Sequence, residues 1–205
     1  MRRTKAIFVE GIIGSGKSTT AHFLTNYLSQ HLIAAQFMPE GGHEHPLRLS
    51  STLPHPFQVW SDLTIDQFIR HSLEKWRAFV QTAQRSESVT VFDGQLFHGN
   101  MTDLLLMNAD PIVLQSYISQ VIDHLRTLTP VLIYFYQANV AQALRVVCDA
   151  RGSAWEAYQV NWKLPSPYGR ERGLAGFAGL VDGSTVQVVQ TWYNGRHGFP
   201  NSYLT

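Results

Sequence analysis

The stretch Gly11-Ile12-Ile13-Gly14-Ser15-Gly16-Lys17-Ser18 decides the fold of this chain. It fits the phosphate-binding pattern G-x-x-x-x-G-K-[ST] at every fixed position. An apolar run at 6–9 precedes it, and a helical pattern follows it over 19–27. The glycines allow positive φ, so successive backbone N–H groups can face one anion, and the dipole of the following helix adds to the attraction. The stretch therefore predicts a strand, a phosphate-binding loop and a helix.

The residue types in this glycine loop (residues 11–18) predict that it binds a nucleotide with Mg²⁺. We expect Lys17 to reach the β/γ-phosphates of ATP and the hydroxyl of Ser18 to ligate Mg²⁺. The alternative is a chance match in a flexible loop, which the flanking strand and helix disfavour. The expected nucleotide-binding residues are Gly11, Gly14, Ser15, Gly16, Lys17, Ser18 and Thr19.

Length and composition predict one globular domain, residues 1–205. The chain has 205 residues, 44% of them hydrophobic and 15% charged, with a formal net charge of +1. This charge gives no electrostatic argument for a nucleic acid or membrane partner. Cys148 is the only cysteine, and no secretory signal or apolar run near twenty residues is present, so we expect a cytoplasmic protein with Cys148 as a buried filler. Monomer and homodimer both stay open.

Strand-like and helix-like segments alternate along most of the chain, which is typical of an α/β domain with a parallel sheet. Capping signals support two of the helices: Thr64 and Gln67 form a candidate capping box, and Asp110 precedes Pro111. The predicted strands are 5–10, 35–38, 89–92, 131–135 and 185–189, and the predicted helices are 17–31, 64–85, 110–125, 140–150 and one that begins at Ser153.

Three acidic residues fall where predicted strands end, the edge at which ligands bind to an open parallel sheet. Asp93 is expected to complete the Mg²⁺ shell opposite Ser18, with a helix cap as the alternative. Glu40 is the candidate base for an incoming hydroxyl, although a solvated turn carboxylate is nearly as well supported. Glu10 is expected to be structural.

Phosphoryl transfer also needs positive charge on the migrating group. Arg145 and Arg151 flank the end of a predicted helix, and Arg170 lies with Arg172 in a glycine-rich stretch. We expect residues 151–183 to form a lid that brings one or more of these arginines to the phosphates, with a mobile loop over 166–183. For each arginine alone, a solvated surface charge is an equal alternative.

Two further signals are weaker. His43, Glu44 and His45 follow Glu40, but their spacing matches no standard metal site, so contact of a histidine with substrate is preferred. Aromatic residues could stack on a planar substrate, although at helical spacing they more often lie in the core. These aromatics are Trp60, Trp76 and Phe97.

The run Val9-Glu10-Gly11 to Ser18-Thr19 closely resembles the P-loop of the deoxynucleoside kinase and thymidylate kinase group. That resemblance implies a three-layer P-loop NTPase fold with a five-stranded parallel sheet, an arginine-bearing lid and transfer of the ATP γ-phosphoryl group. Glu40 then resembles the family's base and Asp93 the acid after the third strand, but Gly94 stands where the family has arginine. The stretches 92–100 and 173–180 are similar to bacterial P-loop proteins.

The sequence therefore favours an ATP-dependent kinase acting on a hydroxyl or phosphate of a small molecule such as a nucleoside, a nucleotide or another hydroxyl compound. Two alternatives stay open: a P-loop ATPase or switch, and a nucleotide-binding module without catalysis. A guanine-specific switch would need N-K-x-D and D-x-x-G motifs, and neither is present at the required place.

Overall fold

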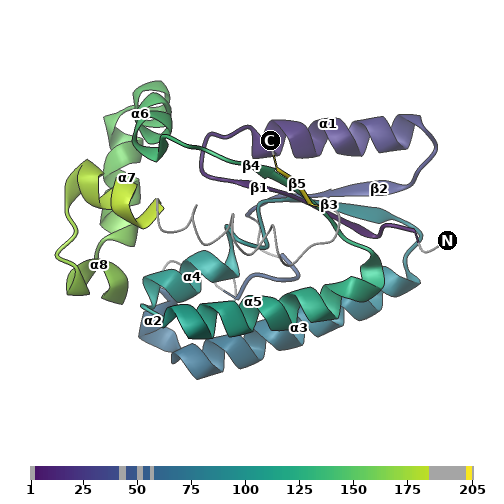
Figure 1. Ribbon diagram of the computed structural model, residues 1–205, viewed down its shortest axis with the longest axis horizontal. Helices are drawn as coiled ribbons and strands as arrows, with labels where there is room; N and C mark the ends of the chain where they lie inside the picture. The colour runs from purple at the N-terminus through teal and green to yellow at the C-terminus, as the bar shows by residue number, and fades with distance from the viewer. Residues whose placement is uncertain (1–2, 42–44, 50–52, 56–57, 185–201, 205) are drawn as a thin grey trace.

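The computed structural model describes residues 3–41, 45–49, 53–55, 58–184 and 202–204. Strands and helices alternate, and the strands form one parallel sheet in the order β2-β3-β1-β4-β5 (Figure 1). Four strands of four to six residues make up most of it: β1 (Ala6–Gly11), β2 (Ala35–Met38), β3 (Val89–Asp93) and β4 (Val131–Phe135). The predicted α/β class with a parallel sheet is confirmed.

The far edge of the sheet differs from the prediction. A three-residue segment, β5 (Ser202–Leu204), pairs with β4 there. The strand predicted at 185–189 lies outside the described residues.

The helices enclose the two faces of the sheet (Figure 1). On one face lies α1 (Lys17–Gln30), packed over a small cluster around Val9, Ala21 and Val91. The other face carries the larger core. Its helices are α2 (Val59–Asp62), α3 (Ile65–Arg85), α4 (Asn100–Leu106) and α5 (Pro111–Leu125), which continues into the 3₁₀ turn η2 (Arg126–Leu128).

A third group of helices lies beyond the carboxyl ends of the strands (Figure 1). These are α6 (Val140–Arg151), α7 (Ser153–Lys163) and α8 (Pro167–Glu171), followed by a helical segment at 176–184. The predicted mobile loop over 166–183 is therefore wrong for most of its length. Two signals make the stretch helical: Ser166 caps α8 by accepting from the Gly169 N–H, and Pro167 occupies the first turn.

Local signals explain where several helices begin. Thr64 and Gln67 form the predicted reciprocal capping box of α3, and Asp110 accepts from the Ile112 N–H at 2.7 Å before Pro111. Ser153 and Glu156 have the spacing of a capping box, but Gly152 is the N-cap of α7 and Ser153 is already helical. Within the described residues, no helix is both long and apolar enough to cross a membrane.

Buried aromatic side chains stabilise the larger core, together with a hydrogen-bond network around the Tyr117 hydroxyl, called here the polar hub. Trp76 and Phe97 lie in this core, as their spacing predicts, and Trp60 packs against it. The hydroxyl of Tyr117 accepts from Trp76 Nε1 at 3.1 Å and pairs with the Ser72 hydroxyl at 2.7 Å. Asn100 Nδ2 donates to the same two hydroxyls.

Tyr117→Phe is expected to lower the free energy of unfolding by about 1–3 kcal/mol, because the buried Trp76 Nε1 loses its acceptor and Asn100 Nδ2 and the Ser72 hydroxyl each lose one partner. Urea denaturation followed by circular dichroism would measure the loss. Tyr27→Phe on the exposed side of α1 is the matched control and should change stability by less than about 0.5 kcal/mol. Equal effects of the two variants would contradict the role given to the hub.

Candidate functional site

The glycine loop connects β1 to α1 through residues with positive φ. Gly11 ends β1, Gly14 has a φ of 79° and Gly16, the N-cap of α1, has a φ of 95°. A Cβ on Gly14 would stand 2.1 Å from Val147 Cγ2, so the loop passes closely under α6. Both the conformation and the space therefore require glycine at position 14.

The amino end of α1 is open to an anion. Across the described residues 3–41, no side chain caps this helix and its first turn holds no acid. Its first N–H groups and its dipole therefore favour a negatively charged ligand. Lys17 begins the helix with a buried side chain, and its Nζ donates to the Ile12 carbonyl within the loop at 3.0 Å.

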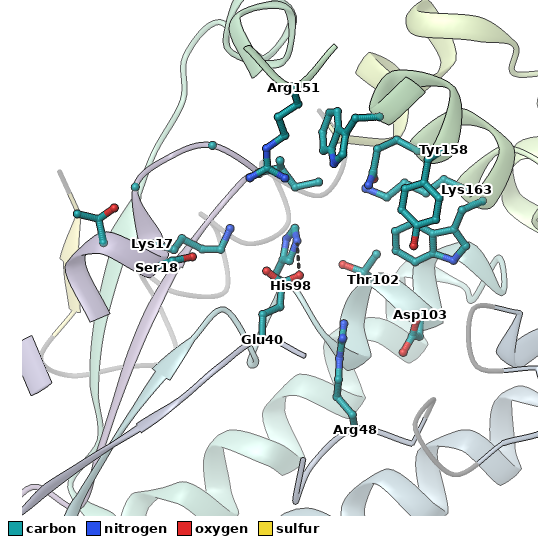
Figure 2. Close-up of a pocket in the computed structure, with 17 residues that line it drawn as sticks. Lys17, Ser18, Glu40, Arg48, His98, Thr102, Asp103, Arg151, Tyr158 and Lys163 are labelled. Carbon is teal, nitrogen blue, oxygen red and sulfur yellow. Dashed lines mark ion pairs between the residues drawn. The ribbon is translucent and has the colours of Figure 1, made fainter. Parts of the chain in front are cut away.

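A cavity of about 470 Å³ opens in front of this loop, between the sheet and α7 (Figure 2). Residues far apart in the sequence line it: Ile13, Gly14, Gly16, Lys17, Ser18, Thr19, Glu40, Arg48, His98, Thr102, Asp103, Arg151, Trp155, Tyr158, Gln159, Trp162 and Lys163. The structure thus brings the glycine loop, the candidate base and one lid arginine to one space. Gly11 and Ser15, also predicted to bind nucleotide, do not line the cavity.

Glu40 is partly buried and faces the cavity, where it pairs with the buried His98, whose Nε2 lies 3.1 Å from the Glu40 carboxylate (Figure 2). Burial works to raise the pKa of Glu40, but His98 together with the cations Lys17 and Arg48 lowers it to about 2. Burial lowers the pKa of His98, against the influence of Glu40. Near pH 7 the pair therefore holds one negative charge, on Glu40, with a neutral imidazole donating to it.

Glu10 has the structural role expected for it. Its carboxylate is fully buried and accepts from the backbone N–H groups of Leu96 at 2.6 Å and His98 at 3.3 Å. Burial raises the pKa of Glu10 to about 7, although these hydrogen bonds and Lys17 oppose the shift. Glu10 thus holds in place the turn that presents His98 to Glu40.

Asp93 ends β3 beside the glycine loop, in register with Val9, but it does not line the cavity. Its Oδ1 is buried and has no hydrogen-bond partner among the described residues. Such an orphaned carboxylate oxygen fits a hydrated Mg²⁺ on the nucleotide, as does the hydroxyl of Ser18 in the cavity wall. In the described part of the chain, no three His, Cys, Asp or Glu side chains gather into a metal site of their own.

Gly94 explains the departure from the kinase pattern after Asp93. It has a φ of 62°, and a Cβ here would lie 2.8 Å from Lys17 Cε. A residue with a side chain would be strained at this φ, and the end of the Lys17 side chain would have to move to make room for it.

The predicted lid arginines occupy different places. Arg151 lines the cavity, and its guanidinium lies 4.9 Å from the ring centre of Trp155. Arg145 lies outside the cavity, paired with Glu156 at 3.2 Å and stacked on Phe177. Arg170 is exposed on α8 and does not reach the cavity either. Arg172, also outside it, stacks on Tyr168.

Neither histidine that follows Glu40 is found in the wall of the cavity among the described residues. His43 and Glu44 lie outside the described residues. His45 is buried away from the cavity, and its Nδ1 accepts from the N–H groups of Leu47 at 3.1 Å and Arg48 at 3.3 Å. Burial, with Arg48 and Lys75, lowers the pKa of His45 to about 4, so its ring is neutral at pH 7.

Several cavity residues were not predicted from the sequence. Lys163 and the aromatic residues of α7 come from a helix whose polar and aromatic positions look like an ordinary surface stripe. Arg48 lies in a stretch with no period. The unpredicted cavity residues that carry polar chemistry are Arg48, His98, Thr102, Asp103, Gln159 and Lys163.

Lys163 is a buried cation that has no anionic partner among the described residues. Only 8% of it is exposed, and its Nζ lies 5.2 Å from the ring centre of Trp162. Burial lowers the pKa of Lys163 from 10.5 to about 8, with Glu40 opposing the shift and Lys17 adding to it. Such a group favours binding of an anion in the cavity and costs stability when the cavity is empty.

Lys163→Met is therefore expected to raise the free energy of unfolding at pH 7, by about 1–3 kcal/mol, and to weaken anion binding. Below pH 8 the wild-type lysine is charged in both states and its burial cost is complete. Between pH 8 and 10.5 the folded state loses the proton first, so the advantage of the variant should shrink. Urea denaturation at pH 7 and 9.5 measures both values. Lys163→Arg, which keeps the charge, should show no gain, and a stabilised arginine variant would contradict this account.

Comparison with known proteins adds no relative: no protein-family model and no curated protein matches this chain.

Proposed function

We propose that this protein is an ATP-dependent phosphotransferase that moves the γ-phosphoryl group of ATP to a hydroxyl or phosphate oxygen of a small molecule. One observation carries the proposal. The glycine loop with Lys17 and Ser18, and the ionised carboxylate of Glu40, line the same cavity. A phosphate-binding loop and a proton acceptor on opposite sides of the migrating group are what such a transfer requires.

The loop side would hold the nucleotide. The N–H groups around Gly14 and Gly16 and the open end of α1 suit the phosphate oxygens. Lys17 would leave the Ile12 carbonyl and pair with the β/γ-phosphates. Bound with the nucleotide, Mg²⁺ would neutralise charge on the phosphates, held by Ser18 and, directly or through water, by Asp93.

Glu40 would act on the acceptor. The acceptor oxygen attacks the γ-phosphorus, the bond from phosphorus to the β-γ bridging oxygen breaks, and ADP leaves with that electron pair. The hydroxyl proton passes to the Glu40 carboxylate. With a pKa of about 2 in the free protein, Glu40 is a weak base, so its main contribution is to orient the hydroxyl and take the proton late, when the oxygen already bonds to phosphorus.

The wall on α7 gives the cavity its remaining properties. Arg151 and Lys163 add positive charge near the phosphates, which stabilises the migrating group. Aromatic side chains of Trp155, Tyr158 and Trp162 face the same space and would exclude water from it. With water excluded, ATP would react with the acceptor and would not be hydrolysed.

The direct test incubates the protein with Mg–ATP and a mixed panel of nucleosides, nucleotides, sugars and hydroxyl-bearing antibiotics. We expect ADP release that depends on one acceptor class, together with a product heavier by one phosphate in mass spectrometry. ADP release at the same rate without any acceptor would instead indicate an ATPase. No ADP release with nucleotide bound would indicate a module without catalysis.

A further inference from the structure

Arg48 lies on the side of the cavity away from the glycine loop. In Figure 2 its guanidinium points into the cavity between Glu40 and Asp103, while Lys17 and Ser18 lie beyond Glu40 and His98. Its positive charge helps to lower the pKa of Glu40 and opposes the rise in the pKa of Asp103. Arg48 is therefore a cation of the acceptor side.

The backbone around Arg48 is fixed by buried groups. Leu47 and Leu49 on either side lie in the core, which directs the alternate residue Arg48 the other way. The His45 ring accepts the N–H of Leu47 and of Arg48, and Asn100 Nδ2 donates to the Leu47 carbonyl at 3.2 Å. Such support for a charged side chain is typical of a binding residue held ready for its ligand.

The charges of the cavity favour an anion at this position. Four cationic side chains line it, Lys17, Arg48, Arg151 and Lys163, against the two carboxylates of Glu40 and Asp103. Glu40 is paired with His98. The phosphates of a nucleotide would lie against the glycine loop, whereas Arg48 lines the cavity on the other side of Glu40, next to Asp103.

We propose that the acceptor carries an acidic group, a phosphate or a carboxylate, and that Arg48 binds it while Glu40 receives the acceptor hydroxyl. This assignment rests on the proposed function. The planar guanidinium of Arg48 suits both acids because each offers two oxygens for parallel hydrogen bonds. Binding of its acidic group to Arg48 would hold the acceptor in one orientation. Its hydroxyl group would then lie next to the γ-phosphate of ATP.

The test uses the full chain with its nucleotide side filled by the non-hydrolysable analogue AMP-PNP and Mg²⁺. Fluorescence of Trp155 and Trp162 in the cavity wall reports binding of the analogue first. Inorganic phosphate and acetate are then titrated separately, with ethylene glycol as a neutral control. We expect at least one of the two anions to bind, and the preferred one tells phosphate from carboxylate.

Arg48→Gln should weaken this anion binding about 10-fold to 100-fold and leave binding of the analogue unchanged. Arg126→Gln on η2, with a side chain 72% exposed, is the matched control and should change neither. Arg48→Lys keeps the charge and should lose less than the glutamine variant, and it replaces that variant if the latter does not fold. Anion binding that Arg48→Gln leaves intact, or none in the loaded wild type, would overturn the assignment. Failure of the analogue to bind would overturn the proposed function itself.

Asp103→Asn distinguishes an acidic acceptor from a basic one. Burial raises the pKa of Asp103 to about 7 although Arg48 opposes the shift, so at pH 8 its carboxylate is largely ionised. The other charged groups of the cavity are Lys17, Glu40, Arg48, Arg151 and Lys163, with His98 neutral. Removing a negative charge beside Arg48 should tighten binding of phosphate or acetate several-fold at pH 8. Weaker binding would show that Asp103 serves a cationic ligand, which contradicts the proposal.

Discussion

Lys17→Ala is expected to lower the rate of phosphoryl transfer from ATP by about 10²-fold to 10³-fold. The lysine is the one cation of the glycine loop itself, and it is already buried beside Glu40 and Gly94. Its charge would be needed most when negative charge spreads over the migrating group. The measurement is ADP release with the acceptor found in the panel, at saturating ATP.

The matched control for this prediction is Lys75→Ala on α3, because Lys75 does not line the cavity. It should keep wild-type activity. A wild-type rate in the Lys17 variant, with normal folding by circular dichroism, would remove the glycine loop from the reaction. Lys17→Ala should leave the position of Arg48 on the acceptor side unchanged, so it tests the glycine loop alone.

Glu40→Gln is expected to lower transfer by about 10²-fold or more while AMP-PNP still binds. Glutamine keeps the shape of the side chain and can still accept from His98 Nε2, but it cannot take a proton. Because the pKa of Glu40 is about 2, the wild-type rate should stay independent of this group down to pH 3–4 for as long as the protein is folded. Single-turnover transfer in the variant and wild type measures the loss at the chemical step.

Glu74→Gln on α3, with a side chain 57% exposed, is the control for the loss of one carboxylate and should be fully active. The Glu40 variant also separates two mechanisms. If Glu40 only supports the fold, acceptor-dependent transfer should fall no more than ATP hydrolysis does. Equal rates of transfer in Glu40→Gln and wild type would exclude Glu40 as the proton acceptor.

Most of the fold could be predicted because its signals are local. The pattern of glycines and the apolar run before it place β1, the loop and α1 within a residue or two of their observed bounds. The capping signals at Thr64 and Asp110 identify the starts of α3 and α5. Continuous apolar runs identify β3 and β4, because both faces of a central parallel strand are covered.

The acceptor side of the site could not be predicted for a physical reason. Arg48 is positioned by contacts of its backbone and of Leu47 with His45 and Asn100, and Asn100 lies 53 positions from Leu47 along the chain. Lys163 reaches the cavity only because α7 folds back over the sheet edge. Such positions depend on tertiary packing, and no spacing along the chain encodes them.

For the lid, residues 151–183, the sequence led to a prediction that is partly wrong. The glycines and arginines of 166–183 predicted a loop that would carry cations to the phosphates, whereas Ser166 and Pro167 begin a helix and Arg172 stacks on Tyr168. The cations that do line the cavity from this side are Arg151 and Lys163. Composition alone therefore gave the right kind of charge but mostly the wrong residues.

The central claim is that the backbone of the glycine loop binds the phosphates of a Mg-bound nucleotide. Hydrogen–deuterium exchange with mass spectrometry tests it directly, on peptides that cover residues 11–18, with and without Mg–AMP-PNP. The account predicts slower exchange of these amides when the analogue is present, and little or no slowing in Lys17→Ala. Unchanged exchange over 11–18 in the wild type at saturating analogue would contradict it.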